Sequence, residues 1–249
     1  MSEESSAGKG KRRVKLVVSV VLLFVALPIV IVIMTRLGSD TYYLTSVVII
    51  VLMMLPFFLS FERRKPTGRE LVVIAVLIAL AVAGRAVFVF VPFVSPVIGL
   101  VILSGIALGS SSGFVVGALA LFVSDFMFGQ GPWTPWQMLA AGAAGWVFGY
   151  LAERGKIARD TLPSKKRLGL AVGAGLFDWI VVGIILNTCT LFTMVSVPTE
   201  LTAIIAVYAA GLPVDLVRGI STALVVYFLA NPLLGKFERV RVKYGLMGQ

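Results

Sequence analysis

Histidine is absent from this sequence of 249 residues, and Cys189 is the one cysteine. Without histidine, the chain lacks the commonest general base and the zinc-binding HExxH helix of membrane metalloproteases. A lone cysteine excludes an internal disulfide and a thiolate metal cluster, and we expect Cys189 to be a small buried apolar residue in a helix. No GxxxxGKS or GxxxxGKT loop is present, so ATP hydrolysis of the P-loop kind is also excluded.

Charged residues are scarce as well, at 14% of the chain, whereas hydrophobic residues make up 59%. The mean hydropathy is +1.00, which leaves too little polar surface to cover a water-soluble globule. The composition therefore predicts an all-α membrane protein. At roughly 20 apolar residues and a short loop for each crossing, the length accommodates about eight transmembrane helices and no folded soluble domain.

Apolar runs of the sequence give the same number of crossings. We expect spans at residues 16–34, 42–61, 71–90, 97–109, 113–128, 134–151, 168–195 and 201–230. No small-x-small cleavage site follows the first run, so we expect it to stay as an anchor and not to be a removed signal. The fourth run is short, and residues 109–113 (Gly-Ser-Ser-Ser-Gly) either separate two spans or interrupt one long span.

The distribution of basic residues favours two spans at that point. The net charge is +10, and Lys and Arg number five in residues 1–15, four in 63–69, six in 154–167 and four after Gly235. With eight spans, all four clusters lie inside, as the positive-inside rule requires, and both termini are cytoplasmic. A merged span would put the cluster at 154–167 outside.

The last run is too long for a simple crossing. Thirty residues would extend about 45 Å as a straight helix, against a hydrocarbon core of about 30 Å. We expect a helix break at residues 211–213 (Gly-Leu-Pro), because proline cannot donate within a helix but suits its first turn. Residues 201–210 would then form an outer cap or a re-entrant segment.

Several polar residues interrupt the apolar runs, and most are predicted to lie in the outer half of the membrane. An ionised side chain in mid-bilayer costs about 2.5 to 3.5 kcal/mol on insertion scales, so each needs a partner or a function. These residues either line a solute cavity or neutralise one another, as Asp215 could with Arg218 on one helix face and Asp125 with Arg85. The set comprises Arg85, Asp125, Asp178, Asn187, Asp215 and Arg218.

The segment at 129–137 is predicted to lie just outside this polar layer. Its glycines and prolines favour a turn, and Trp133 and Trp136 offer flat faces beside Gln137. The tryptophans either edge a cavity that suits a polar, ring-containing solute or anchor the helices at the membrane interface.

Small residues recur every fourth position on three of the predicted spans. Such a strip lets another helix approach closely, either within the chain or from a partner. The strips are Ala75, Ala79 and Ala83 on the third span, Gly113 and Gly117 on the fifth, and Gly145 and Gly149 on the sixth.

Taken together, these segments resemble a known family. They are the AxxxAxxxA span with Arg85, the Pro92-Phe93 loop, LGSSSGFVVGAL, SDFMFGQGPWTPWQMLAAGAAGWVFGYLA and GLPVDLVRG. This set resembles the substrate-binding S component of energy-coupling factor (ECF) transporters, and within that group the cobalamin type. The likeness covers residues 69–235, which implies a six-helix core preceded by two extra transmembrane helices within 16–61. Residues 1–15 and 236–249 would then be cytoplasmic tails.

The resemblance implies a multi-pass subunit of a bacterial cytoplasmic-membrane vitamin importer. It implies docking to a transmembrane coupling subunit through Ala75, Ala79 and Ala83, with two partner ATPase subunits hydrolysing ATP. A corrinoid such as cobalamin is the first expectation for the ligand, with riboflavin or a queuosine precursor as alternatives, because a fold does not fix its substrate. The expected substrate-binding residues are Arg85, Asp125, Trp133, Trp136, Gln137, Asn187, Asp215 and Arg218.

Two other classes of function remain open from the residues alone. Asp125, Asp178 and Asp215 could act as acid and base or hold a metal in a membrane enzyme, although no signature spacing pairs them. The small-residue strips could instead belong to a structural assembly protein. We expect no catalytic residue, no metal site and no cofactor of the chain's own, and no nucleic-acid partner.

Overall fold

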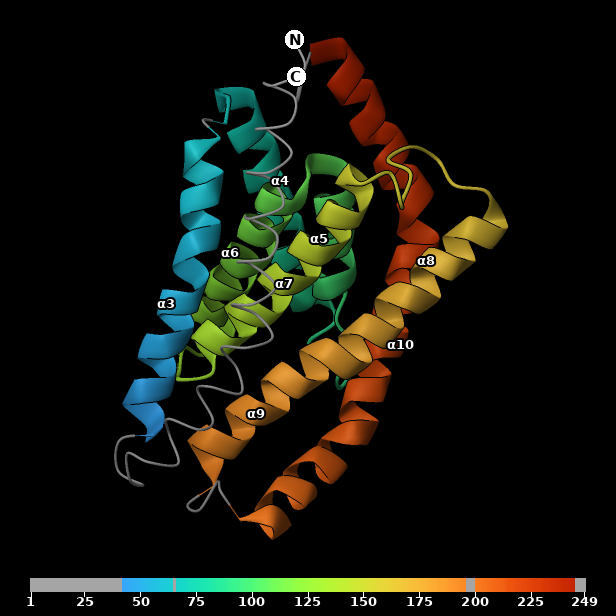
Figure 1. Cartoon of the computed structure of the whole chain (residues 1–249). Helices are drawn as coiled ribbons and strands as arrows, with labels where there is room; N and C mark the ends of the chain where they lie inside the picture. Colours follow the sequence, from blue (N-terminus) through green and yellow to red (C-terminus); the bar gives the residue numbers. More distant parts are fainter. Residues whose placement is uncertain (1–41, 65, 196–199, 245–249) are drawn as a thin grey trace, which may run out of the picture.

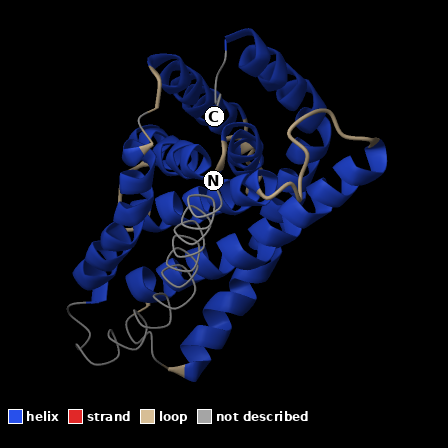
Figure 2. Cartoon of the chain, turned by 45° about the horizontal axis from the view of Figure 1, so that its top comes forward, coloured by secondary structure: helices blue, strands red, loops and turns tan. Residues whose placement is uncertain are grey.

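The structure is a computed structural model that describes residues 42–64, 66–195 and 200–244, and this part of the chain is helical without strands (Figures 1 and 2). The helices follow the apolar runs closely. Their bounds are α3 Tyr42–Arg63, α4 Gly68–Val87, α5 Val97–Leu108, α6 Ser110–Phe128, α7 Thr134–Glu153, α8 Ser164–Phe177, α9 Gly183–Met194 and α10 Leu201–Tyr244. A π-helical turn, Asp178–Val182, joins α8 to α9 without interruption.

Gly109 separates α5 from α6 and confirms that residues 97–128 are two helices. Its φ of 95° and ψ of 170° belong to a region that is essentially restricted to glycine. A Cβ at this position would lie 2.7 Å from Oε1 of Glu153, which also accepts from the backbone N–H of Ser110 at 2.8 Å. The turn is therefore fixed both by backbone conformation and by a carboxylate from α7.

The loop between α3 and α4 is joined to the same turn. The Arg64 guanidinium forms an ion pair with the buried Glu70 carboxylate and donates to Ser112 Oγ at 2.8 Å. Burial lowers the pKa of the Arg64 guanidinium, and the nearby Glu153 carboxylate partly opposes this shift. These contacts hold one end of α3, α4, α6 and α7 in a fixed arrangement.

Glycines bring α5, α6 and α7 into close contact at the centre of the bundle. A Cβ on Gly113 would lie 2.5 Å from the carbonyl oxygen of Gly145, and one on Gly145 would lie 2.2 Å from the carbonyl oxygen of Gly113. Gly117 and Gly149 face neighbouring backbone in the same way. These two predicted strips therefore serve packing within the chain.

Helix α3 packs on this core through aromatic rings. The Phe57 ring stacks on Phe114 of α6 with centroids 4.3 Å apart, and it meets Trp146 of α7 edge to face at 5.9 Å. Phe57 and Phe114 are both buried. The second predicted N-terminal span is thus part of the packed bundle, whereas the first, at residues 16–34, lies outside the described residues.

The predicted break at residues 211–213 is wrong, because α10 is continuous from Leu201 to Tyr244 with Pro213 inside it (Figure 1). In lipid the backbone has no water to bond, so a helix tolerates proline more readily than it tolerates unravelling. Gly211 has a different role, since its Cα faces the Asn187 amide so closely that a Cβ would lie 2.3 Å from Oδ1.

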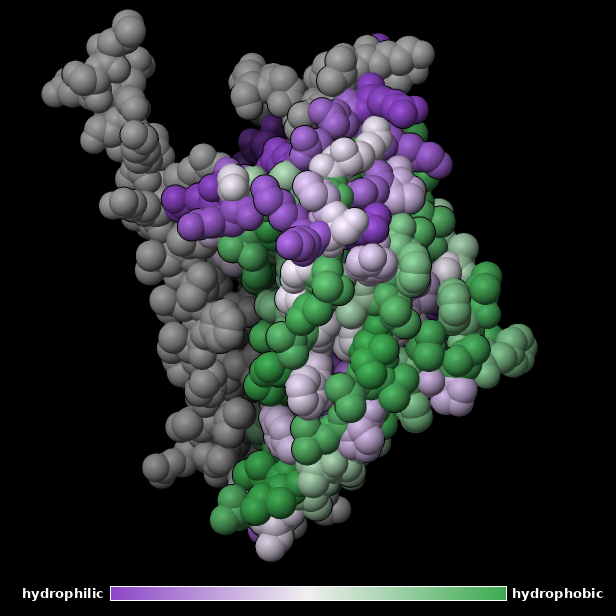
Figure 3. Space-filling view, turned by 90° about the vertical axis from the view of Figure 1, so that its right-hand side faces the viewer, coloured by the Kyte–Doolittle hydropathy of each residue, from purple (hydrophilic) through white to green (hydrophobic). Residues whose placement is uncertain are grey.

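The protein is a multi-pass membrane protein. Four helices within the described residues are long and apolar enough to cross a bilayer, namely Gly68–Val87, Ser110–Phe128, Ser164–Met194 and Leu201–Val240. The predicted total of eight crossings is not established, because α5 has 12 residues, against the about 20 that a crossing needs. Hydrophilic side chains gather at one end of the molecule, above a hydrophobic belt (Figure 3).

Candidate functional site

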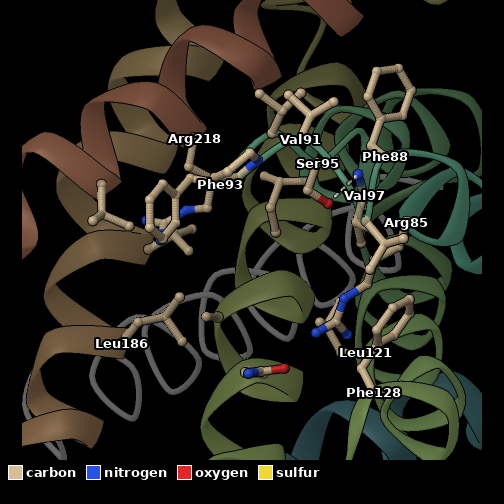
Figure 4. Close-up of a pocket in the computed structure, with 18 residues that line it drawn as sticks. Arg85, Phe88, Val91, Phe93, Ser95, Val97, Leu121, Phe128, Leu186 and Arg218 are labelled. Carbon is tan, nitrogen blue, oxygen red and sulfur yellow. Dashed lines mark hydrogen bonds between the residues drawn. The ribbon is translucent and has the colours of Figure 1, made fainter.

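A cavity of about 400 Å³ lies at the end of the bundle away from the basic loops. The chain segment between α4 and α5 forms one side of it, and α4, α5, α6, α7, the π-helical turn, α9 and α10 contribute the rest. Figure 4 shows Arg85 with Phe128 on one side and Arg218 with Phe93 on the other. This volume falls within the range of about 300 to 1,000 Å³ that is typical of small-molecule sites.

The cavity wall is mainly apolar and partly aromatic. Phe88 and Phe93 come from the α4–α5 segment and Phe128 from the end of α6. Phe93 has a φ of 63°, which is uncommon for a residue with a side chain, and the residue is 58% exposed. Strained backbone of this kind persists where the surroundings fix it and is common at ligand sites.

Arg85 is held on one side of the cavity by buried partners. Its Nη1 lies 2.8 Å from Oδ1 of Asp125 and also donates to Ser124 Oγ, while the guanidinium carbon lies 4.7 Å from the centroid of the Phe128 ring. Asp125 is 1% exposed, and its Oδ2 accepts from Thr134 Oγ1 at 3.1 Å. Asp125 therefore orients Arg85 and does not itself reach the cavity.

Arg218 is held by two carboxylates. Its Nε donates to Oδ1 of the buried Asp178 at 2.7 Å, and its Nη1 lies 2.9 Å from Oδ1 of Asp215, three residues earlier on α10. Asp178 opens the π-helical turn, a feature that occurs frequently at functional sites. Asn187 completes the cluster, because its Nδ2 donates to Oδ2 of Asp215 at 2.7 Å.

Gln137 supplies an acceptor atom that has no hydrogen bond to any described residue. It lines the cavity from the first turn of α7, and its Oε1 is buried without a hydrogen-bond partner among the described residues. A buried acceptor without a partner costs about 1 to 3 kcal/mol, so an acceptor of this kind beside a cavity is available to a ligand that donates a hydrogen bond.

The structure thus separates the eight predicted site residues into three groups. Arg85, Gln137 and Arg218 line the cavity, and three others bond the arginines or one another: Asp125, Asp215 and Asn187. The two tryptophans do neither. Trp136 is fully buried in the core, and the Trp133 indole donates to the Gly129 carbonyl at 3.3 Å.

The segment between α4 and α5 was not assigned to the site from the sequence. The span predicted at 71–90 includes the first part of this segment. Its Phe88 and Phe93 rings and the Ser95 hydroxyl all contribute to the cavity. The available signal was the pair of prolines, Pro92 and Pro96, which exclude a helix through an otherwise apolar stretch.

The alanine strip of α4 differs from the glycine strips. Ala75, Ala79 and Ala83 are all exposed, and no other described helix covers them. Large apolar neighbours on the same helix, Val72 and Val76, are more than 60% exposed as well. This face of α4 therefore contacts either lipid or another protein.

Comparison with known families matches most of the chain to a family model. Residues 65–234, close to the range 69–235 of the resemblance, match the model described as "ECF-type riboflavin transporter, S component". No curated protein and no solved structure matches the chain.

Proposed function

The chain belongs to the family of ECF-type riboflavin transporter S components, and from this premise we propose that its ligand is riboflavin. An S component is the substrate-binding membrane subunit of an ECF transporter. The cavity of about 400 Å³ between the α4–α5 segment and the helix ends is the observation that carries the proposal. We place the protein in the bacterial cytoplasmic membrane, with this cavity toward the outside.

The cavity wall fits the chemistry of a flavin. Riboflavin has a flat, largely apolar three-ring system, which suits a wall containing Phe88, Phe93 and Phe128. One edge of its ring system carries carbonyl groups and an imide N–H, and the guanidinium of Arg85 and the amide of Gln137 can pair with these. The unpartnered Oε1 of Gln137 would accept from the imide N–H.

The electrostatics of the cavity favour an uncharged ligand. Arg85 is paired with Asp125, and Arg218 is paired with Asp178 and Asp215, so neither guanidinium presents an uncompensated charge. Both keep N–H groups near the cavity wall as hydrogen-bond donors. Riboflavin is uncharged and has several acceptor atoms, which matches this arrangement.

Cobalamin, the first expectation from the sequence, is the less favoured ligand. Its corrin ring with two axial ligands is much larger than a flavin, whereas the cavity is near the lower end of the range for small-molecule sites. A queuosine precursor fits the size better but is not named by the matched family. Both are the alternatives that a binding experiment must separate.

The wider assembly is also a proposal. We propose that a transmembrane coupling subunit docks on the exposed Ala75, Ala79 and Ala83 face of α4, and that two ATPase subunits drive transport. The chain would need no cofactor and carry out no catalysis. Asp125, Asp178 and Asp215 each pair with an arginine, an arrangement that suits orientation of cavity groups better than acid–base chemistry.

Ligand titration of the purified, ligand-stripped full chain tests this proposal. Riboflavin should bind with one-to-one stoichiometry, seen as quenching of flavin fluorescence and as heat in calorimetry, while cobalamin and a queuosine precursor should give no saturable signal. Saturable cobalamin binding without riboflavin binding would overturn the ligand assignment. Mass spectrometry of the recovered riboflavin should show it unchanged, and a modified product would revive the enzyme reading.

A further inference from the structure

A second cavity, of about 800 Å³, lies at the opposite, basic end of the molecule. It is formed by the last turns of α7, the connection at residues 154–163 and the first turns of α8. It shares no lining residue with the proposed riboflavin cavity.

The entrance of this cavity is strongly basic. Lys156, Arg159 and Lys166 line it, and the described lining contains no acidic residue. Lys156 and Lys166 are exposed and form no ion pair with another described residue. The cavity therefore presents positive charge that is available to an anion.

Polarity changes with depth in the cavity. The lysines lie near the ends of α7 and α8, whereas the apolar residues Phe148 and Leu170 lie one or two turns further into the bundle. The α8 side of the cavity is open at Gly169 and Gly173, where an added Cβ would meet no atom within 4 Å. Figure 3 shows the corresponding boundary, with hydrophilic side chains at this end and a hydrophobic belt beneath.

The segment that closes the cavity is fixed to the bundle. The backbone of Leu162 bonds the Asn231 amide of α10 in both directions, with N–H to Oδ1 at 2.8 Å and Nδ2–H to the carbonyl at 3.0 Å. At the other end of the segment, the Lys156 N–H donates to the Leu151 carbonyl at 2.9 Å. The basic residues are thus presented by an ordered segment that is held at both ends.

We propose that this cavity binds one anionic phospholipid of the cytoplasmic leaflet. Lys156, Arg159 and Lys166 contact the phosphate, and an acyl chain lies along the glycine side of α8. The charge complementarity and the head-to-tail change in polarity carry this assignment. Basic pockets between helices on the cytoplasmic side recognise anionic headgroups, and each basic side chain near such a surface strengthens binding about fivefold.

Native mass spectrometry of the full chain tests the charge requirement. The probe is dioleoylphosphatidylglycerol, with dioleoylphosphatidylcholine, which is zwitterionic and has no net charge, as the comparison. The variant Lys156→Gln/Arg159→Gln/Lys166→Gln should bind phosphatidylglycerol roughly 100-fold more weakly. Its control, Arg63→Gln/Lys236→Gln/Arg239→Gln, removes the same charge from exposed positions outside the cavity and should retain the lipid. Equal weakening in both variants would overturn the proposal.

If Arg159 proves necessary for folding, the variant Lys156→Gln/Lys166→Gln changes exposed residues alone and should weaken binding about 25-fold. Riboflavin titration of each variant reports folding independently, since none of these residues lines the first cavity.

A second variant tests the acyl-chain groove. Gly173→Leu fills open space on α8 and should reduce phosphatidylglycerol retention about tenfold, whereas Gly68→Leu, at another open glycine, should not. Displacement of the lipid by millimolar inorganic phosphate would show that the chains contribute nothing and would overturn the lipid assignment. Loss of the coupling subunit from the triple variant, with lipid binding intact, would identify a protein-docking surface and would also overturn it.

Discussion

The Ser221 hydroxyl bonds the backbone of Ser95 in both directions. It donates to the Ser95 carbonyl at 3.0 Å and accepts from the Ser95 N–H at 3.2 Å. These bonds fasten the α4–α5 segment, which forms one side of the ligand cavity, to α10. We expect Ser221→Ala to speed riboflavin dissociation about tenfold, because two net bonds of about 0.5 to 1.5 kcal/mol are lost. Stopped-flow flavin fluorescence measures this rate, and Ser60→Ala, far from the cavity, should leave it unchanged.

Asp178→Asn should destabilise the protein and weaken ligand binding together. Asp178 is fully buried and is one of the two carboxylates that hold Arg218, so the substitution leaves the guanidinium with Asp215 alone. Removing one partner of a buried ion pair outright costs about 3 to 5 kcal/mol, and part of this cost is expected here. Thermal unfolding in detergent should show this loss. The triple variant Asp178→Leu/Asp215→Leu/Arg218→Met removes the arginine and both of its carboxylates, so it should recover stability but not riboflavin affinity. Recovery of both would argue against a ligand role for Arg218.

Gln137→Leu should weaken riboflavin binding without lowering stability, in contrast to Asp178→Asn. Its Oε1 has no partner among the described residues, so replacing the amide removes a desolvation cost and should leave the unfolding temperature equal or higher. Riboflavin affinity should fall about tenfold in calorimetry. Met138→Leu on the same helix, outside the cavity, is the control. Unchanged affinity in Gln137→Leu would remove this residue from the site.

Gly109→Ala should be more damaging than Gly155→Ala. Both glycines have positive φ, of 95° and 69°, but a Cβ on Gly155 meets no atom within 4 Å, whereas one on Gly109 collides with Glu153. Left-handed backbone alone costs about 1 to 2 kcal/mol for a residue with a side chain. The unfolding temperature should therefore drop modestly for Gly155→Ala and several degrees further for Gly109→Ala. Equal drops would mean that the contact with Glu153 is unimportant.

Ala79→Trp should block co-purification with the coupling subunit while leaving riboflavin binding intact. Ala79 lies in the middle of the exposed strip, where a large side chain prevents close helix approach. Leu224→Trp, at an exposed apolar position of α10, is the matched control because Leu224 is 52% exposed and belongs to another helix. An undiminished yield of the complex with Ala79→Trp would exclude the strip as the docking surface.

Helix positions could be predicted from the sequence because apolar length in a membrane protein is set by the bilayer. The predicted spans at 42–61 and 97–109 correspond to α3, Tyr42–Arg63, and α5, Val97–Leu108. The turn at Gly109 was also predictable, since only the separation of α5 from α6 puts the basic clusters on one side. The helix break predicted at Pro213 is wrong because local helix propensity is a weak guide in lipid, where the backbone has no alternative hydrogen-bond partner.

The site was harder to predict because the depth of a residue in the membrane does not show which side of its helix the side chain faces. Arg85 and Asp125 were both predicted near the outer ends of their spans, with either a cavity or a mutual pair as the outcome. The structure shows both at once, because the two side chains pair and Arg85 also lines the cavity, and this arrangement depends on helix rotation. Trp136 was expected beside the solute and is instead fully buried, since a tryptophan near an interface can point either way. Phe93 reaches the cavity through an unusual backbone conformation that composition does not reveal.

The stacking of Phe57 on Phe114 limits how far the chain can be shortened. The family match begins at residue 65, after α3 has ended. A fragment that began there would leave the Phe114 and Trp146 rings facing acyl chains. Lipid tails are as apolar as the lost helix, so the penalty would arise from poorer van der Waals fit and not from exposure to water. Such a fragment would dissolve in detergent as readily as the whole chain, yet its α6–α7 surface would accept unrelated helices.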